Sequence, residues 1–265
     1  MSVSRRAYYN WLSRPESKLE NKNKTITKSI KNIFYENRQV YGAPRIHKVL
    51  TEEGYQCSLN HVARLMRKAN IVPKTVKKFR VTTDSRKSIK PVPNLLNRQF
   101  SPLQINRVWA SDVTYIPTRK GWLFLAVVLD LYSRRVVGWS MGERLTSYLA
   151  QQALSNALQQ RCISDGVLHH SDQGKEYYAN EYQMLLKDNN LVASMSRKGD
   201  CYDNAVVESF FHSLKTELVH HSDYYNQQEA RISLFDYIEL FYNRKRKHSY
   251  LGYLSPVAFE KANLC

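Results

Sequence analysis

Cysteine is scarce in this sequence, and its four copies are far apart. They stand at positions 57, 162, 201 and 265, so there is no C-x-x-C pair and no His/Cys cluster with zinc-finger spacing. This pattern excludes a disulfide scaffold and a zinc finger as the basis of the fold, and it predicts reduced thiols inside a cell.

Long apolar runs are also missing. The longest, Trp122–Leu129, is well short of the roughly 20 residues that a membrane-spanning helix needs. The first residues, MSVSRRAYYNWL, lack the apolar stretch of a signal peptide. We therefore expect a soluble intracellular protein with no contact to a membrane.

Acidic residues are scarce in the first part of the chain. Residues 1–105 hold 22 lysines and arginines against 6 acidic residues, whereas residues 106–265 hold 18 against 17. Nearly all of the net charge of +17 thus lies in the N-terminal part. Because concentrated positive charge is typical of proteins that bind nucleic acid, we predict a DNA-holding N-terminal region joined to a nearly neutral core.

Residues 1–71 show the apolar spacing of short helices. Residues 41–71 predict two helices separated by a turn at Gly54, with Ser58 as the cap of the second. Basic side chains lie opposite the apolar positions of that second helix, which resembles a helix-turn-helix with a recognition helix. The alternative is a helical bundle whose basic face is only solvated, and the charge of the region favours DNA. The predicted DNA contacts here are Arg45, His61, Arg64, Arg67 and Lys68.

Residues 72–105 are basic and rich in proline and polar residues, without clear periodicity, and we predict a linker. Beside DNA such a linker either follows the phosphates or is merely solvated, and the sequence favours neither.

From residue 106 to residue 265 the pattern changes to that of an α/β domain. Three strand-like runs in a meander are followed by helix, strand, helix, strand and two further helices. This order predicts a mixed five-stranded sheet with helices on its faces. The expected strands are 108–117, 121–133, 134–141, 167–171 and 191–195, and the expected helices are 146–161, 176–189, 201–218 and 227–243.

Three acidic residues stand in unusual places in this core. Asp112 lies inside a strand-like run, where aspartate is rare. Asp172 directly follows the fourth strand, at the kind of position where α/β folds bind ligands. Glu208 flanks the apolar stripe of the helix expected at 201–218. Singly, each has an ordinary explanation: a bulge or edge residue, a turn former and an amphipathic boundary.

Helical geometry places other polar residues beside Glu208. At 100° per residue, Asn204, His212 and Lys215 fall in one row with Glu208 along the apolar face. Thirty-five residues separate Asp172 from Glu208, and Lys215 follows Glu208 by seven. This spacing alone is weak evidence that the three carboxylates act together, and it becomes specific with the sequence words that flank these residues.

In this spacing the sequence resembles the DDE transposases and retroviral integrases. The flanking words resemble the OrfB product of bacterial insertion sequences of the third-insertion-sequence group. They are W-x-x-D-x-T-Y at 109–115, H-S-D-x-G-x-x-Y at 170–177, D-N-A-x-x-E-S-F-F at 203–211 and Y-N-x-x-R-x-H-x-x-L-G-Y-x-S-P at 242–256.

This resemblance implies an RNase H-like core over 106–265, with Asp112, Asp172 and Glu208 as catalytic metal ligands. It implies two Mg²⁺ or Mn²⁺ ions, for which carboxylate oxygens are suitable ligands. Lys215 would neutralise a phosphate, and Asn204 would either orient Glu208 or contact DNA. His169 and His170 are expected to be structural or to contact DNA. The predicted C-terminal DNA contacts are Arg244, Lys245, Arg246, Lys247 and His248.

The function that the resemblance implies is metal-dependent cleavage and 3′-OH strand transfer at the ends of an insertion sequence, in the cytoplasm of a bacterium and near its nucleoid. The implied partners are double-stranded DNA (terminal inverted repeats and target), further copies of the chain, and an upstream OrfA protein or a fusion to it. Two alternatives are a catalytically silent DNA-binding regulator and an RNase H-like nuclease. The complete set of three carboxylates argues against the first, and the helix-turn-helix remains unexplained by the second.

Overall fold

A computed structural model describes residues 4–74, 92–163, 166–197 and 201–263 of the chain. The chain divides into two compact units, Met1–Thr75 and Val76–Cys265. Among the helices of these described ranges, none has the length and apolar character needed to cross a membrane.

The N-terminal unit is all-helical. Its helices are α1 (Arg5–Leu12), α2 (Lys18–Glu36), α3 (Ala43–Glu52) and α4 (Leu59–Lys68). Helix α2 begins at Lys18, directly after Ser17. The cause is a capping box, in which Ser17 accepts a hydrogen bond from the backbone of Glu20 and Glu20 accepts one from the backbone of Ser17.

Helices α2, α3 and α4 pack around one small core. Ser58 caps α4 as predicted, since its hydroxyl accepts a hydrogen bond from the backbone of His61. Leu59, at the first position of α4, is exposed. The buried residues that join the three helices are Ile26, Ile30, Ile33, Phe34, Ile46, Leu50, Val62, Leu65 and Met66.

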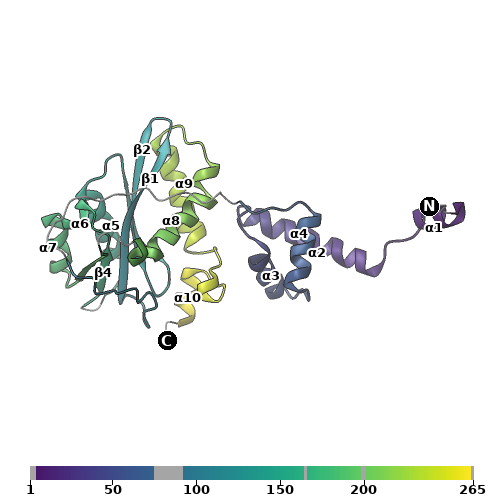
Figure 1. The fold of residues 1–265 in the computed structure, drawn as a ribbon, viewed down its shortest axis with the longest axis horizontal. Helices are drawn as coiled ribbons and strands as arrows, with labels where there is room; N and C mark the ends of the chain where they lie inside the picture. Colours follow the sequence, from purple (N-terminus) through teal and green to yellow (C-terminus); the bar gives the residue numbers. More distant parts are fainter. Residues whose placement is uncertain (1–3, 75–91, 164–165, 198–200, 264–265) are drawn as a thin grey trace. The chain divides into compact units, whose positions relative to one another are not determined.

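The second unit is built on a five-stranded mixed sheet, as predicted (Figure 1). The strands are β1 (Val108–Thr118), β2 (Gly121–Asp130), β3 (Val136–Gly142), β4 (Leu168–Ser171) and β5 (Val192–Met195). Their order across the sheet is β3-β2-β1-β4-β5. The first three strands form an antiparallel meander, and β4 and β5 pair in parallel with β1 and with each other. Strand β1 is therefore central.

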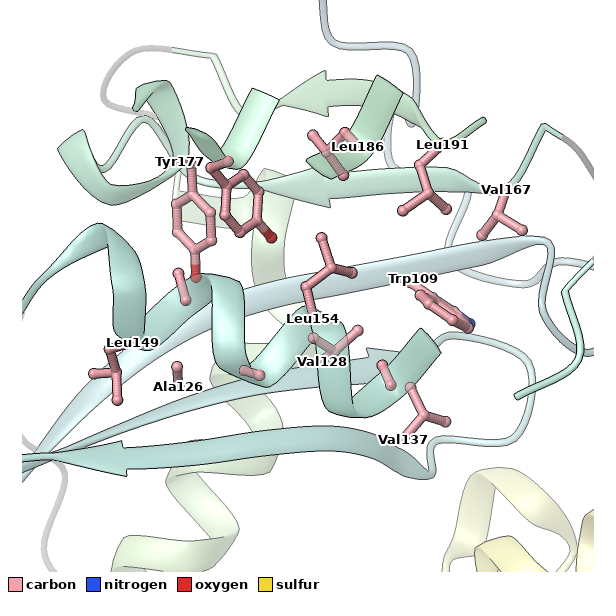
Figure 2. Close-up of a cluster of buried hydrophobic side chains, with 14 of the residues drawn as sticks. Trp109, Ala126, Val128, Val137, Leu149, Leu154, Val167, Tyr177, Leu186 and Leu191 are labelled. Carbon is pink, nitrogen blue, oxygen red and sulfur yellow. The ribbon is translucent and has the colours of Figure 1, made fainter. Parts of the chain in front are cut away.

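Helices cover both faces of this sheet. On one side lie α5 (Ser147–Gln160), α6 (Lys175–Tyr178) and α7 (Asn180–Asp188), and on the other lies α9 (Gln227–Phe235) (Figure 1). Helix α10 (Pro256–Asn263) packs at the β2–β3 turn, where the ring of Phe259 meets that of Tyr132. Helix α8 (Ala205–Glu217) packs beside β1. Figure 2 shows side chains of α5 meeting those of the strands, with Leu154 and Leu149 above Val128, Ala126 and Val137.

Three helical segments differ from the prediction. The helix expected at 176–189 is two helices, which break at the extended backbone of Ala179. The helix expected at 227–243 continues from α9 into a π-helix, Asp236–Tyr242. The helix expected at 201–218 begins with a 3-10 turn, Cys201–Asn204, before α8. Helix α10 was not predicted.

The predicted linker is shorter than 72–105. Residues 75–91 of it lie outside the described residues, but residues 92–98 pack on the sheet unit. The backbone amides of Leu95 and Leu96 donate to the Ser194 hydroxyl, and Leu96 is buried. The Asn94 side chain donates to Asp203 at 2.7 Å. This segment therefore belongs to the edge of the core at β5.

Gly138 lets α5 approach the sheet closely. A Cβ at this position would lie 2.6 Å from both the Cβ and the backbone nitrogen of Ala157. We expect Gly138→Ala to lower the free energy of unfolding by about 1–3 kcal/mol or more, because helix backbone has to move. Chemical denaturation measures the loss. Gly142→Ala in the same strand is the control, since its Cβ would lie 3.2 Å from the flexible end of Leu149 and at an ordinary 3.5 Å from the Arg144 carbonyl oxygen. Equal stability of the two variants would contradict the close packing.

Candidate active site at the ends of the central strands

Asp112 and Asp172 are brought together by the register of the sheet. Strand β4 pairs in parallel with β1, and the last pair is Ser111 with Ser171. Each aspartate is the next residue of its strand, so the two carboxylates emerge at the same edge. Strand β1 continues to Thr118 along β2, whereas β4 ends at Ser171. This is the position at which α/β folds commonly bind ligands.

Local hydrogen bonds orient both carboxylates. The Asp112 carboxylate accepts a hydrogen bond from the backbone of Val113 at 2.8 Å. The Asp172 carboxylate accepts one from the backbone of Gly174 at 2.9 Å. A Cβ on Gly174 would lie 2.6 Å from an oxygen of Glu176 and 2.9 Å from one of Asp172, so a side chain here would displace at least one of these carboxylates.

Glu208 lies in the first turn of α8, and its side chain is exposed. Val207, Phe210 and Leu214 form the buried side of this helix, which holds it against the core. Lys215, two turns further on, places its Nζ 4.8 Å from the ring centroid of Tyr115 in β1. The helix therefore brings a carboxylate and an amine next to β1.

Asn204 does not belong to the predicted row on the helix. It ends the 3-10 turn before α8 and is buried, and its Nδ2 donates to the carbonyl oxygen of Ser111 at 3.3 Å. Its Oδ1 is buried without a hydrogen-bond partner. Asn204 thus ties the start of α8 to the residue that precedes Asp112.

The carboxylates disfavour one another's charge. Burial raises the pKa of Asp112 well above its usual value, and the negative charges of Asp172 and then Glu208 raise it further. Burial also raises the pKa of Asp172. Although the Glu208 side chain is exposed, partial desolvation of its carboxyl raises its pKa, and the charge of Asp172 adds to this effect. The three predicted residues are therefore close enough to interact electrostatically.

A fourth carboxylate, Glu176, lies in the same place and was not predicted. Burial raises its pKa, and so does the charge of Asp172. The sequence feature that could have predicted Glu176 is its spacing: it follows Asp172 by four residues, with Gly174 in the turn between them.

These residues suit a hard divalent cation. Their donors are carboxylate oxygens, which Mg²⁺ and Mn²⁺ prefer, and none of the four carboxylates has an ion pair within the described residues. Across the described ranges, however, no three His, Cys, Asp or Glu side chains already form a compact metal cluster. A cation would thus draw together groups that now repel.

The two histidines before Asp172 have structural surroundings. His169 is hydrogen-bonded to Ser111 and Tyr182, and burial lowers its pKa to about 3. His170 is hydrogen-bonded to Ser194 and Ser196, and burial lowers its pKa to about 4. Both rings are therefore neutral at pH 7 and link neighbouring strands.

The predicted basic contacts of the N-terminal unit differ in exposure. Arg64, Arg67 and Lys68 are exposed on α4. His61 is half-buried, with its Nε2 2.8 Å from Oδ1 of Asn23 in α2. Arg45 lies over the ring of Tyr41, 5.5 Å from its centroid. Helix α4 thus presents three cations to solvent.

The prediction for Arg246 is wrong. This residue is 5% exposed, and its Nη2 lies 2.6 Å from Oε1 of Glu217 in a buried ion pair. A guanidinium held in this way is not available to a DNA phosphate. His248 packs its ring against Tyr242 at 4.8 Å between centroids, and its neighbour Lys247 is half-buried. Arg244 and Lys245 are exposed.

Comparison with known proteins places this geometry in a family. The integrase core domain matches residues 102–201, a second integrase core domain matches 208–264, and an HTH-like domain matches 20–79. The chain is 41% identical over its full length to the transposase InsF for insertion sequence IS3A of Escherichia coli K12, covering 92% of that protein. The chain belongs to the IS3 family of insertion-sequence transposases.

Two further comparisons agree with this assignment. The transposase is also 41% identical to a 31 kDa protein of insertion element IS600 from Shigella sonnei, over 98% of this chain and 95% of that one. Its fold resembles a chain of the simian T-cell lymphotropic virus intasome, with a TM-score of 0.51, 13% identity and coverage of 89% of this chain and 76% of that chain. The predicted family, fold class and function are thereby confirmed. A transposase with an integrase-type core is a DNA-acting polynucleotidyl transferase.

Proposed function

We propose that Asp112, Asp172 and Glu208 are the catalytic carboxylates of this transposase and that they hold two Mg²⁺ or Mn²⁺ ions. The observation that carries the proposal is the register of β1 and β4, which places both aspartates one residue beyond the same strand pair. Helix α8 brings the third carboxylate, Glu208, to the side of β1. The rise in pKa that these acids cause in one another supports their proximity.

The bound ions would supply the charge that activates an attacking oxygen and stabilises the leaving one in an in-line displacement at phosphorus. The chain itself does the positioning. The paired strands fix Asp112 and Asp172, and Asn204 fixes the start of α8 through the Ser111 carbonyl. Lys215 is placed to neutralise a phosphate of the bound strand.

Both chemical steps are displacements at a phosphate. In cleavage, water attacks the phosphorus and the bond to the 3′ oxygen breaks, which leaves a free 3′-OH. In joining, that 3′-OH attacks a target phosphate and displaces another 3′ oxygen. No covalent bond between protein and DNA forms in either step, so the site needs no nucleophilic serine or tyrosine.

The partners follow from this assignment. The exposed Arg64, Arg67 and Lys68 of α4 support binding of the terminal inverted repeats by the N-terminal unit. Pairing of two element ends requires at least two sites, which we propose two copies of the chain supply. An OrfA protein from the upstream frame, separate or fused, remains part of the proposal.

The decisive experiment incubates the full chain with duplexes that carry the terminal repeats of its own element. We expect nicked and joined products with Mg²⁺ or Mn²⁺, and none in EDTA, because the carboxylates then have no cation to hold. Adding Mg²⁺ back in excess of the EDTA restores them. Joining that persists in EDTA would contradict the metal assignment. A protein that shifts the duplex in gels but makes no product with Mg²⁺ would be a DNA-binding regulator, and cleavage of RNA–DNA hybrids without joining would indicate a nuclease.

A further inference from the structure

Two large aromatic side chains lie exposed beside the candidate active site. Tyr115 of β1 is 53% exposed and Trp122 of β2 is 51% exposed. Their ring centroids are 5.1 Å apart and their planes cross at 87°. Tyr115 pairs with Phe124 across the hairpin, and Pro117 pairs with Trp122, so all four lie on one face of the sheet.

The interior of the protein does not account for this pair. Phe124 packs against the apolar cluster beneath α5, but the two rings closer to the hairpin turn lie beyond that cover. Because about half of the Trp122 indole is in contact with water, covering its apolar surface with a ligand would be favourable. The pair therefore has contact area available for a ligand.

Basic groups connect the pair to the site of chemistry. Tyr115 and Asp112 are three residues apart in β1, so their side chains point to opposite faces of the sheet. The link to the site is Lys215 of α8, whose Nζ lies 4.8 Å from the Tyr115 centroid. At the hairpin turn, the Nζ of Lys120 lies 4.7 Å from the centroid of Tyr225, which is also exposed. Aromatic faces that alternate with amines suit a polyanion that carries flat rings, which is the chemistry of a nucleic acid strand.

We propose that Trp122 and Tyr115 form a stacking platform for one unpaired base of the DNA strand beside the cut phosphate. The proposal rests on the proposed catalytic site, because Lys215 and Asp112 define where that phosphate lies. The base has to be unpaired, since both faces of a base inside a duplex are already covered by its neighbours. The platform accepts any base, because every base has a π-face.

A binding assay that needs no chemistry tests this assignment. The probe is an element-end duplex with a short single-stranded overhang, in which 2-aminopurine replaces one unpaired base next to the cleavage position. In EDTA, binding of the full chain should quench the probe, because stacking on an aromatic ring quenches 2-aminopurine. Trp122→Ala should abolish the quenching and weaken binding of the overhang probe about 5- to 150-fold. Trp122→Phe should keep both, which shows that the ring matters rather than a loss of folding.

Tyr250→Ala is the matched control, because Tyr250 is 55% exposed and its ring packs against Arg134 in the β2–β3 turn, at the end of β2 opposite the hairpin. It should quench as the wild type does. Quenching that survives in Trp122→Ala would overturn the platform. The platform would also be overturned if Trp122→Ala changed the sedimentation coefficient of the protein while quenching persisted. The two rings would then mediate contact between copies of the chain. Because the assay omits metal, it succeeds or fails independently of whether Asp112→Asn removes joining.

Discussion

Asp112→Asn is expected to abolish DNA joining and at the same time to raise the melting temperature of the metal-free protein. Joining should fall by more than about 10³-fold, since one member of a catalytic unit is lost. Binding of element-end DNA in EDTA should remain close to that of the wild type. Gel assays of joined product and of bound duplex measure the two effects separately.

The gain in stability has an electrostatic cause. Burial and the charges of Asp172 and Glu208 raise the pKa of Asp112, so its ionised form costs free energy in the folded state. An acid with a raised folded pKa loses stability as the pH rises from its unfolded value, near 4, through its folded value. Asparagine stays neutral and accepts the same hydrogen bond from Val113. The difference in melting temperature between the variant and the wild type should therefore grow with pH. Each kcal/mol of electrostatic destabilisation that the variant removes corresponds to about 2–4 °C.

Asp188→Asn serves as the control, because Asp188 is an exposed acid at the end of α7. It should change neither joining nor the melting temperature. Wild-type joining by Asp112→Asn would refute the catalytic role, and an unchanged or lower melting temperature would show that the carboxylates do not repel one another.

Glu217→Ala is expected to lower the free energy of unfolding by about 3–5 kcal/mol, because it leaves a buried guanidinium without its partner. Two hydrogen bonds from Arg246, 2.6 Å from Nη2 and 2.8 Å from Nε, reach the Glu217 carboxylate. The Tyr237 hydroxyl donates a third, at 2.8 Å. Burial alone would lower the pKa of Arg246, but the hydrogen bonds and charge of Glu217 outweigh it and the pKa is raised. Urea denaturation measures the loss.

Two further variants isolate the ion pair. Arg244→Ala removes an exposed arginine two residues away and should leave stability nearly unchanged. The double variant Glu217→Leu with Arg246→Met removes both charges, and it should recover most of the stability that the single variant loses. A double variant as unstable as Glu217→Ala would mean that packing, and not the unpaired charge, causes the loss.

The positions of Asp112 and Asp172 could be predicted because they depend on short-range patterns. An aspartate inside an apolar strand and another directly after a strand are visible in the sequence, and parallel pairing then brings them together. The five strands were predicted for the same reason, since their apolar runs are separated by turn residues. The exposed side of α8 that carries Glu208 followed from its helical period.

The surroundings of the site could not be predicted, because they depend on partners far away in the chain. Arg246 lies in a run of basic residues typical of a solvated surface, and its carboxylate partner stands 29 residues earlier, on another helix. Asn204 has the helical spacing of a row with Glu208, yet the Ser111 carbonyl holds it in the turn before the helix. Residues 92–98 have the composition of a linker, and Asp203 and Ser194 hold them on the core.

The pairing of Ser111 with Ser171 has a consequence for how such a chain tolerates insertions and deletions. Both aspartates take their direction from a two-residue strand period, so losing one residue from β1 before Asp112, or from β4, would turn a carboxylate to the opposite face of the sheet. Residues added at the turn between β3 and α5, around Glu143, would lengthen the path from Asp112 to Asp172 and leave both directions unchanged. Insertions and deletions should therefore be tolerated in the turns, whereas the paired segments of β1 and β4 have to keep their number of residues.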